Sequence, residues 1–430
     1  MKSLRRLVRA GSIQDRATRR VVIAVAACAF AEWGGASSVL PLLPIYLRHH
    51  GSSLPMVGLT MAAFFAAAVL VQYPMGRLSD RIGRRQIQIG GLIAYSVATV
   101  LFALFAAPWA AFFFRALQGA GTGIVDVANA AMIGEVVPEK ERGKAFGSFY
   151  GARTVGMAIG PFLGGLTGVG HMDYLFLAAA AVVLTATVPI TFLTPRTSGH
   201  LPVRRHERTP LWRSRSVMGV GLAFLAGGLL IGTYEVCWSL LLDLRGATSW
   251  ELGLSWTLFA FPFAVVSLPA GWLVDHMDRR ALVIFSLAGS AAFALVYPFL
   301  HSVAWLVGLG ALEAVTVALG APAELAQLSS SVPARELGRA QGAVSSMQTG
   351  AVAVMATISG ALFGVRPWLP FVVAAGAIGA VIVALSFVWR GVPGRGSLPG
   401  HRPLEPAAGP VGVASPLELS PERLRVERAG

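Results

Sequence analysis

The sequence predicts an all-α membrane protein with twelve transmembrane helices in two pseudo-symmetric six-helix bundles. Its composition, its apolar stretches and an internal repeat are the observations behind this prediction. Of the 430 residues, 55% are hydrophobic and only 13% are charged, against roughly 25% charged residues in typical soluble domains. So few charges cannot cover a surface that faces water on all sides. A soluble globular protein, a disordered chain, a collagen-like chain and a disulfide scaffold are therefore excluded.

Twelve segments of the chain reach the length that a helix needs to cross a bilayer, roughly 20 mostly apolar residues. They span residues 21–46, 57–76, 87–106, 109–133, 145–166, 174–193, 217–242, 252–273, 281–299, 303–326, 340–363 and 368–389. Because the first of them is long enough to cross the bilayer, we do not expect a removable signal peptide.

Hydrophilic stretches divide these spans into domains. We expect an N-terminal segment at 1–20, a six-helix bundle at 21–193, a basic linker at 194–216, a second six-helix bundle at 217–389 and a tail at 390–430. The tail is rich in Pro, Gly and Arg and lacks apolar periodicity, so we expect it to be disordered.

The basic residues predict the orientation of the chain in the membrane. Of the 35 Lys and Arg residues, 30 lie in the termini, the linker and the loops on one side, while only Arg48, Arg245 and Arg366 lie in loops on the other. Cytoplasmic loops carry such an excess, so both termini are expected in the cytoplasm. This asymmetry also explains the net charge of +14 without nucleic acid as a partner, and it suggests contact with anionic lipids.

The two halves of the chain are related by a constant offset of 195 residues. Matched pairs include Gly58 and Gly253, Pro74 and Pro269, Asp80 and Asp275, Glu141 and Glu336, and Gly165 and Gly360. Two related bundles can rock about a site near the membrane midplane and so expose it to each side in turn. Two repeats of six spans are not the architecture expected of a channel or of a seven-helix receptor.

The loop between the second and third spans, Gly-Arg-Leu-Ser-Asp-Arg-Ile-Gly-Arg-Arg at 76–85, carries the strongest motif. It resembles the signature loop of the major facilitator superfamily. An aspartate there can accept charge-assisted hydrogen bonds from arginines or a helix N-terminus, so we expect the loop to latch one conformation. The alternative is that its arginines only set the topology. The expected latch residues are Gly76, Asp80, Arg81, Gly83, Arg84 and Arg85, and in the second copy Gly271, Asp275, Arg279 and Arg280.

The second copy of this loop, at 271–280, is degraded. His276 stands at the position of Arg81, and Asp278 stands at that of Gly83. We therefore expect a weaker latch in the second half of the chain.

Spans four and five carry two further motifs of the same superfamily. The segment Arg-Ala-Leu-Gln-Gly-Ala-Gly at 115–121 resembles its second signature, which implies that Arg115 takes part in proton coupling. The alternative is a structural arginine bonded to backbone carbonyls. The segment at 156–165 is similar to a motif of drug:proton antiporters, although a role in helix packing alone is the other interpretation. Its residues are Gly156, Gly160, Pro161, Gly164 and Gly165.

Charges inside the first six spans are functional candidates, because a charge in a bilayer is costly. Drug:proton antiporters often carry an acidic residue in the first helix, so Glu32 facing Arg115 is the expected proton-titrating pair. Asp126 is expected to accept a proton or bind a cation. Arg153 can pair with Asp126 or meet an anionic substrate, and Trp33 can line an apolar cavity. The alternatives are a hydrated carboxylate without coupling and purely structural charges.

The second half offers two carboxylates beside aromatic residues. Glu235 lies near Trp238 in span seven, and Glu313 takes the repeat position of Gln118. A carboxylate beside aromatic rings attracts a lipophilic cation through charge and cation–π contact. We therefore expect Glu235, Trp238 and Glu313 to contact substrate.

The sequence lacks the residues that several other classes of function require. The chain has only three lysines and no phosphate-binding G-x-x-x-x-G-K-[ST] loop, which argues against ATP-driven transport by this chain alone. Its two cysteines, Cys28 and Cys237, lie in separate apolar spans and make no metal site. No nucleophile lies near a base in a known motif, so we expect neither an enzyme, nor catalytic residues, nor a metal or other cofactor.

The expected function is proton-coupled efflux of small amphipathic compounds by alternating access. The resemblance implies a bacterial cell membrane as its location, and we expect a monomer whose partners are the substrate, protons and membrane lipids. One alternative is a facilitator, exporter or importer of a metabolite such as a sugar, a siderophore or a lipid-linked molecule, without proton antiport. Another is a transporter-like sensor or scaffold with no flux of its own.

Overall fold

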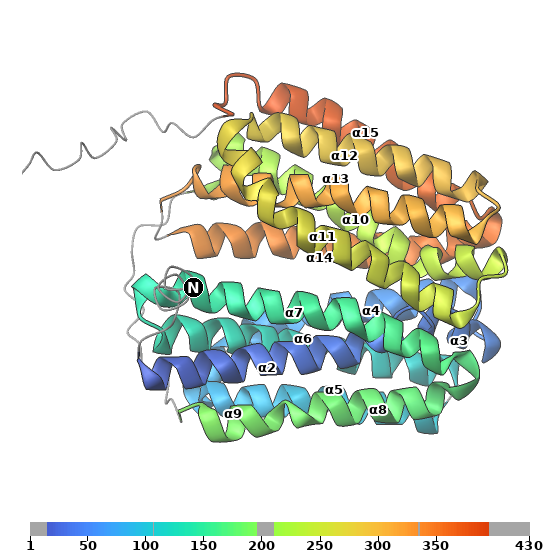
Figure 1. Cartoon of the computed structure of the whole chain (residues 1–430), viewed down its shortest axis with the longest axis horizontal. Coiled ribbons are helices and arrows are strands. Elements are labelled where there is room, and N and C mark those ends of the chain that lie inside the picture. Colours follow the sequence, from blue (N-terminus) through green and yellow to red (C-terminus); the bar gives the residue numbers. More distant parts are fainter. Residues whose placement is uncertain (1–14, 106, 196–209, 334–335, 395–430) are drawn as a thin grey trace, which may run out of the picture. The chain divides into compact units, whose positions relative to one another are not determined.

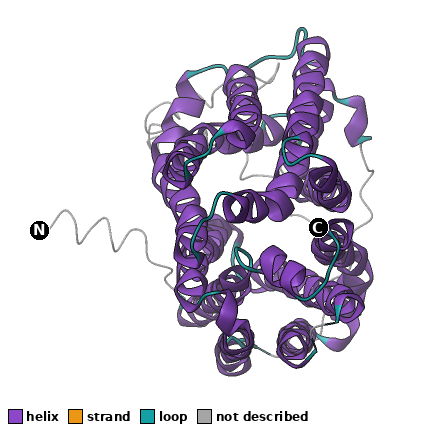
Figure 2. Cartoon of the chain, turned by 90° about the vertical axis from the view of Figure 1, so that its right-hand side faces the viewer, coloured by secondary structure: helices purple, strands orange, loops and turns teal. Residues whose placement is uncertain are grey.

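The computed structural model describes residues 15–105, 107–195, 210–333 and 336–394. Every regular element in these ranges is a helix (Figure 2), which confirms the all-α prediction. Most of the predicted N-terminal segment, linker and tail lies outside the described residues. Residues 390–394 are described. We expected them to belong to a disordered tail, but other parts of the chain hold them by hydrogen bonds.

The first bundle is built from the helices of the first half of the chain. They are α2 (Arg16–Val39), α3 (Leu43–His49), α4 (Leu54–Ile82), α5 (Arg84–Leu104), α6 (Pro108–Val136), α7 (Glu139–Thr167), α8 (Met172–Thr185) and α9 (Thr187–Leu193). The first predicted span is thus two helices with a turn at 40–42, and the sixth is broken at Ala186 between α8 and α9.

The second bundle repeats the arrangement with fewer breaks. Its helices are α10 (Arg215–Leu244), α11 (Ser249–His276), α12 (Arg279–Val296), α13 (Val303–Ser329), α14 (Leu337–Val365) and α15 (Leu369–Val388). Three single 3₁₀ turns, Val169–His171, Leu211–Arg213 and Tyr297–Phe299, complete the described elements.

Ten of the described segments are long and apolar enough to cross a membrane. The helices α6 and α7 complete the twelve predicted spans. Each has 29 residues, but they carry the intramembrane charges Arg115, Asp126 and Arg153, which lower their hydropathy. The chain is therefore a multi-pass membrane protein, and α6 and α7 are two of the helices that carry charges inside its membrane segments.

Local sequence explains where the helices begin and end. The Asp15 side chain accepts a hydrogen bond of 3.0 Å from the Thr18 backbone and caps α2. Thr248 and Glu251 form a reciprocal capping box at the start of α11. Gly83, with φ 111°, ends α4 inside the signature loop, where a residue with a side chain would be strained.

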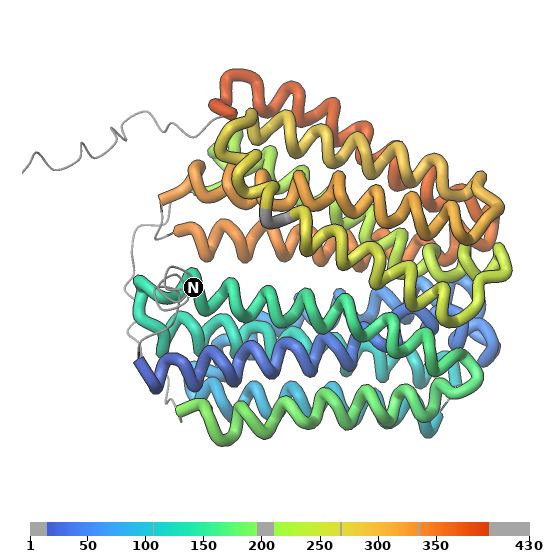
Figure 3. The backbone as a smooth tube through the Cα atoms, in the orientation of Figure 1, coloured from blue at the N-terminus to red at the C-terminus, as the bar shows by residue number. Residues whose placement is uncertain are grey.

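Helix packing preserves the repeat that the sequence predicts (Figures 1 and 3). In the first bundle α2 packs on α7, α4 on α6, and α5 on α6 and α8; in the second α10 packs on α14, α11 on α13, and α12 on α13 and α15. Each of these contacts has its counterpart 195 residues along the chain. We call the helix ends that carry the loops at 76–85 and 271–280 the basic end, and the opposite ends the far end.

The bundles contact each other through two glycine crossings at the far end. Helix α4 packs on α14 through Gly58 and Gly360, and α7 packs on α11 through Gly165 and Gly253. A Cβ atom on Gly58 would lie 2.6 Å from the Ala356 carbonyl oxygen, and one on Gly165 would lie 2.9 Å from the Gly253 Cα atom. The two crossings are equivalent under the repeat, since Gly58 corresponds to Gly253 and Gly165 to Gly360.

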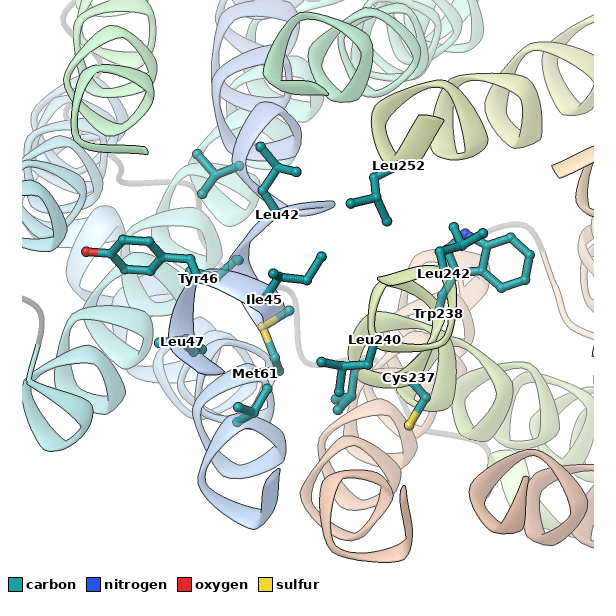
Figure 4. Packing of buried hydrophobic residues seen from close by; sticks show 14 of the residues in the cluster. Leu42, Ile45, Tyr46, Leu47, Met61, Cys237, Trp238, Leu240, Leu242 and Leu252 are labelled. Carbon is teal, nitrogen blue, oxygen red and sulfur yellow. The ribbon is translucent and has the colours of Figure 1, made fainter. Parts of the chain in front are cut away.

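Apolar side chains complete this contact. A buried cluster at the far end draws residues from both bundles, among them Leu42 and Met61 from the first and Leu240 and Leu252 from the second (Figure 4). The other large buried clusters each lie within one bundle. In this conformation the bundles are therefore joined at the far end.

Candidate functional site

A polar site lies in the first bundle where α2, α6 and α7 meet. The Nη1 atom of Arg153 is 3.8 Å from Oδ2 of Asp126, and the guanidinium lies 3.8 Å from the centroid of the Trp33 ring. The two charged side chains are 28% (Asp126) and 27% (Arg153) exposed. The structure thus contains the expected pairing of Arg153 with Asp126, and both side chains are partly exposed.

Glu32 forms the buried part of this site. Its side chain is 1% exposed, and within the described chain its carboxyl oxygens have at most the nearby Thr122 hydroxyl as a hydrogen-bond partner. Asp126 and Arg153 are the charged groups that act on it. Asp126 is the carboxylate paired with the Arg153 guanidinium, and Glu32 lies within reach of both charges without an ion pair of its own to that arginine. Two carboxylates and one guanidinium carry a formal charge of minus one when both acids are ionised. Such a site inside a membrane favours the uptake of one positive charge.

The expected ion pair between Glu32 and Arg115 is not formed in this structure, because the two residues lie at different depths. Glu32 is 17 residues before the end of α3 at His49, while Arg115 is only seven residues after the start of α6 at Pro108. At 1.5 Å per residue, Arg115 is about 15 Å nearer the far end. Asp126, 18 residues after Pro108, has the depth of Glu32.

Arg115 has its own partners in the first bundle. It is 2% exposed, it donates a 3.0 Å hydrogen bond to Gln118, and Gln118 donates one of 2.9 Å to Thr99. The guanidinium lies 4.4 Å from the Phe64 ring centroid. The carboxylate that acts on Arg115 is Glu235, which belongs to α10 in the second bundle. These two residues place opposite charges on the two sides of the bundle contact.

The second bundle encloses Glu313 among aromatic side chains. The carboxylate accepts hydrogen bonds from the Tyr234 hydroxyl at 3.1 and 3.2 Å and from the Tyr297 hydroxyl at 2.7 Å. Trp238 packs edge-on against Tyr297 and donates a 3.0 Å hydrogen bond to Ser255. Glu313 is 1% exposed, so a substrate cation would have to displace the tyrosines to reach it.

The glycine-rich segment of α7 has two packing faces. Gly156, Gly160 and Gly164 lie against α2 at Phe30, Gly34 and Ser38, whereas Gly165 lies against α11 of the other bundle. Pro161 sits inside the helix between them. Helix α7 therefore connects the polar site, through Arg153 on the same helix, to a glycine crossing between the bundles.

The two copies of the signature loop make different contacts. In the first copy Arg84 binds Asp80, Ser79 and, at 3.3 Å, Glu135 on α6. Arg81 is exposed and Arg85 is half-buried, and among the described atoms a Cβ atom on Gly76 would meet the Val127 side chain at 3.5 Å. This copy thus holds its own bundle together in the present conformation.

In the second copy the replacement residue Asp278 contributes directly. It pairs with Arg280 at 2.7 Å, and Arg280 donates to the carbonyl oxygens of Trp389 at 3.3 Å and Val392 at 2.5 Å. The Arg279 backbone donates to Gly394 at 3.0 Å. This loop therefore fixes residues 389–394 beyond α15, while Gly271 and Asp275 stay exposed. The Arg280 hydrogen bond lowers the pKa of Asp278.

Comparison with known proteins decides the family. The chain matches the sequence profile described as Major Facilitator Superfamily over residues 25–244 and 236–423. The chain belongs to this superfamily. As a member of it, the chain is a membrane transporter with two six-helix bundles.

Relatives of this transporter include named resistance proteins. It is 25% identical to Multidrug resistance protein 2 of Bacillus subtilis (strain 168) over 380 residues, which cover 84% of this chain and 93% of that protein. It is 25% identical to the class H tetracycline resistance protein of Pasteurella multocida over 334 residues, 73% of this chain and 81% of that one. A shorter match, 37% identity over 153 residues, covers 35% of this chain and 38% of the uncharacterized MFS-type transporter YttB of B. subtilis (strain 168).

Solved structures share the fold at low identity. The crystal structure of the nucleoside transporter NupG superposes with a TM-score of 0.71 at 12% identity, over 86% of this chain and 99% of that one. A bacterial homologue of the human lysosomal transporter Spinster, in an inward-facing and occupied conformation, has a TM-score of 0.66 at 14% identity, over 87% and 96%. These similarities support the fold of this superfamily member and do not identify its substrate.

Several partners in this transporter's polar sites were missed from the sequence. Tyr234 and Tyr297 bind Glu313, and Gln88 and Asn129 form a buried pair in the first bundle. Each is a single polar residue in an apolar span, and such residues also occur as isolated core positions. The available signal was the helical spacing of Gln88, Tyr95 and Thr99 on one face of α5.

Proposed function

We propose that this transporter exports small amphipathic compounds in exchange for protons, by alternating access between its two bundles. The observation that carries the proposal is the charge balance at the first polar site, where Asp126 pairs with Arg153 and the buried Glu32 lies near both. A buried site with one negative charge in excess is stabilised by one proton or by one cationic group of a substrate. Because either one neutralises the site, the two ligands compete, and competition of this kind produces antiport.

The surroundings of the ion pair suit an amphipathic substrate. The Trp33 ring already packs on the Arg153 guanidinium, and an aromatic face also attracts an organic cation. Asp126 is more than a quarter exposed and can meet such a cation directly. Glu32 is buried and is the group that we assign to the proton.

Helix α7 provides a route from protonation to movement. It carries Arg153, packs its glycines against the helix of Glu32, and reaches the other bundle at Gly165. A proton on Glu32 leaves Arg153 to Asp126 alone, which changes how α7 is held against α2. The same helix then shifts the crossing with α11, so that the two-state equilibrium of the bundles depends on the proton.

The relatives named above support efflux as the direction, since their names refer to drug and tetracycline resistance. We place the transporter in the cell membrane with the basic end in the cytoplasm, following the asymmetry of its basic residues. Because the bundles are joined at the far end, this conformation would then be closed to the outside.

The test is proton movement in proteoliposomes under an imposed pH gradient. Lipophilic cations, neutral drugs, sugars and siderophores are added one at a time, and the internal pH is followed. We expect at least one amphipathic compound to trigger proton movement in the wild type and not in Glu32→Gln. The control is Glu139→Gln, which removes an exposed carboxylate at the start of α7 and should change nothing.

Two results would overturn the proposal. Substrate transport with no accompanying proton movement would favour a facilitator. Unchanged proton movement in Glu32→Gln would show that the proton binds elsewhere.

A further inference from the structure

A second polar group lies inside the first bundle, between Glu32 and the basic end. Gln88 on α5 donates a 2.5 Å hydrogen bond to Asn129 on α6 and contacts the Cys28 sulfur on α2 at 3.7 Å. All three residues are 0% exposed. Cys28 belongs to a buried apolar cluster that includes Leu92 on α5 and Val125 on α6. Two amides in such an interior need a reason beyond packing.

The hydrogen bonds of this group are incomplete. Within the described chain, the Gln88 Oε1 and the Asn129 Nδ2 are buried without a hydrogen-bond partner, and the Glu32 carboxyl oxygens have at most the nearby Thr122 hydroxyl. Buried polar groups in native proteins are almost always paired with protein atoms or with ordered water. A buried water with two to four polar partners satisfies such atoms. Here the unpartnered atoms are donors and acceptors from three helices around one interior.

The order of these residues along the helices describes a path. Gln88 is four residues from Arg84, and Cys28 is four residues from Glu32, so each step is about 6 Å along its helix. Gln88 touches Cys28, which joins the two steps. The whole distance from Glu32 to Arg84 is then about 12 Å, which a few water molecules cover at hydrogen-bond spacing. At the basic end Arg84 binds Glu135, which is itself 18% exposed.

We propose that Gln88 and Asn129 hold ordered water in the first bundle, through which Glu32 exchanges its proton with the water phase at the basic end. Glu32 gives its proton to the first water, each water passes one on, and the last releases one to bulk solvent. The proton path and the substrate path are then separate. Gln88 and Asn129 are positioning residues, and the proposal rests on the proton role of Glu32. The competing account is a dry bridge that only ties α5 to α6.

Substitutions at Asn129 separate these accounts in the full-length protein in proteoliposomes. We expect Asn129→Leu, which closes the path, to lower proton-driven transport on the order of 100-fold. Exchange of labelled for unlabelled substrate needs no proton release and should stay near the wild-type rate. Asn129→Ser leaves room for water and should restore proton-driven transport. Ser96→Ala, which removes a buried hydroxyl of α5 beyond the path, is the matched control and should have no effect.

Three outcomes would overturn the proposal. Equal losses of proton-driven transport and substrate exchange in Asn129→Leu would indicate a structural bridge. Unchanged transport in that variant would show that protons do not use this route. If Asn129→Leu does not fold, the folded Asn129→Ser decides instead, and its failure to support proton-driven transport would overturn the proposal.

The two cysteines give a test that does not depend on transport. Cys28 touches the proposed path, whereas Cys237 is equally buried in the second bundle, where its sulfur donates to the Ser359 carbonyl at 3.6 Å. After transfer into D₂O, infrared spectroscopy follows the conversion of each S–H to S–D, with Cys28→Ala and Cys237→Ala assigning the bands. We expect Cys28 to exchange clearly faster than Cys237. Equal, slow exchange at both would overturn the path even if Glu32 proves to carry the proton.

Discussion

The two bundles each bury a glutamate completely, but they treat it in opposite ways. Glu32 in the first bundle and Glu313 in the second are both 1% exposed. Glu313 accepts hydrogen bonds from two tyrosines, whereas Glu32 has at most the Thr122 hydroxyl among the described residues and lies beside the Arg153–Asp126 pair. Burial by itself therefore does not identify a functional acid. The incomplete environment of Glu32 is the one suited to a ligand that comes and goes, and the satisfied Glu313 is suited to holding the second bundle together.

The largest expected effect comes from removing the cation of this site. Arg153→Leu leaves two carboxylates without a counter-ion, and we expect loss of proton-coupled transport. Removing one partner of a buried pair typically destabilises by about 3–5 kcal/mol, and less is expected here because the pair is partly exposed. Arg153→Lys keeps the charge and should retain measurable transport. Thermal unfolding in detergent and proteoliposome transport measure the two effects, and full activity of Arg153→Leu would contradict this account of the site.

In the second bundle we expect a change in stability without a change in coupling. Tyr297→Phe removes one of the hydrogen bonds to Glu313 and should lower the free energy of unfolding by about 1–3 kcal/mol. Proton movement per substrate should stay at the wild-type value. Tyr95→Phe is a control of the same chemistry in a buried tyrosine of the first bundle. If Tyr297→Phe altered the proton stoichiometry, the division of roles between the bundles would be wrong.

The glycine crossings are where the two bundles should behave alike. Gly58→Ala and Gly253→Ala are repeat-equivalent substitutions, and each places a methyl group against the backbone of the other bundle. At position 58 the new Cβ atom would lie 2.6 Å from the Ala356 carbonyl oxygen. Both should weaken the contact at the far end and raise the population in which it is open. Spin labels across the far end measure that population. Gly271→Ala places its new methyl group more than 4 Å from any described atom beyond its own helix backbone and chain neighbours and should leave the open population unchanged. The same result for all three variants would show that the glycine crossings do not hold the far end closed.

The smallest expected effect concerns the second signature loop. Because the Arg280 hydrogen bond lowers the pKa of Asp278 below its ordinary 3.8, the stabilisation is present above about pH 4 and is lost as the pH falls through the lowered pKa. Asp278 is 37% exposed, so its contribution should stay below about 1 kcal/mol. Protease sensitivity of the chain after α15, compared between wild type and Asp278→Asn across pH 3–7, measures it. A pH dependence that persisted in Asp278→Asn would assign it to another group.

Hydropathy and the 195-residue repeat predicted the fold, because both depend on many residues at once. The breaks at 40–42 and at Ala186 were not predicted, since an apolar sequence does not show where a span bends. The candidate residues Glu32, Asp126 and Arg153 followed from the rarity of intramembrane charges. Their grouping did not, because which face of a helix meets which neighbour depends on packing that no single span contains.

The expected pairing of Glu32 with Arg115 shows this limit. Family resemblance placed the two residues together, but their distances from the helix ends put them at different depths. The tail boundary shows it too, since residues 390–394 lack apolar periodicity and are nevertheless held by Arg279, Arg280 and Gln327. Hydrogen bonds that distant residues donate to the backbone carbonyls of a segment leave no pattern in the sequence of that segment.

Proton release on substrate binding tests the central claim most directly. The purified transporter is mixed with a transported compound in weakly buffered detergent solution, and a pH indicator counts the protons released per molecule. We predict release from the wild type and from Glu313→Gln, and none from Glu32→Gln. Release that persists in Glu32→Gln, or that disappears in a folded Glu313→Gln, would contradict the assignment of the proton to the first bundle.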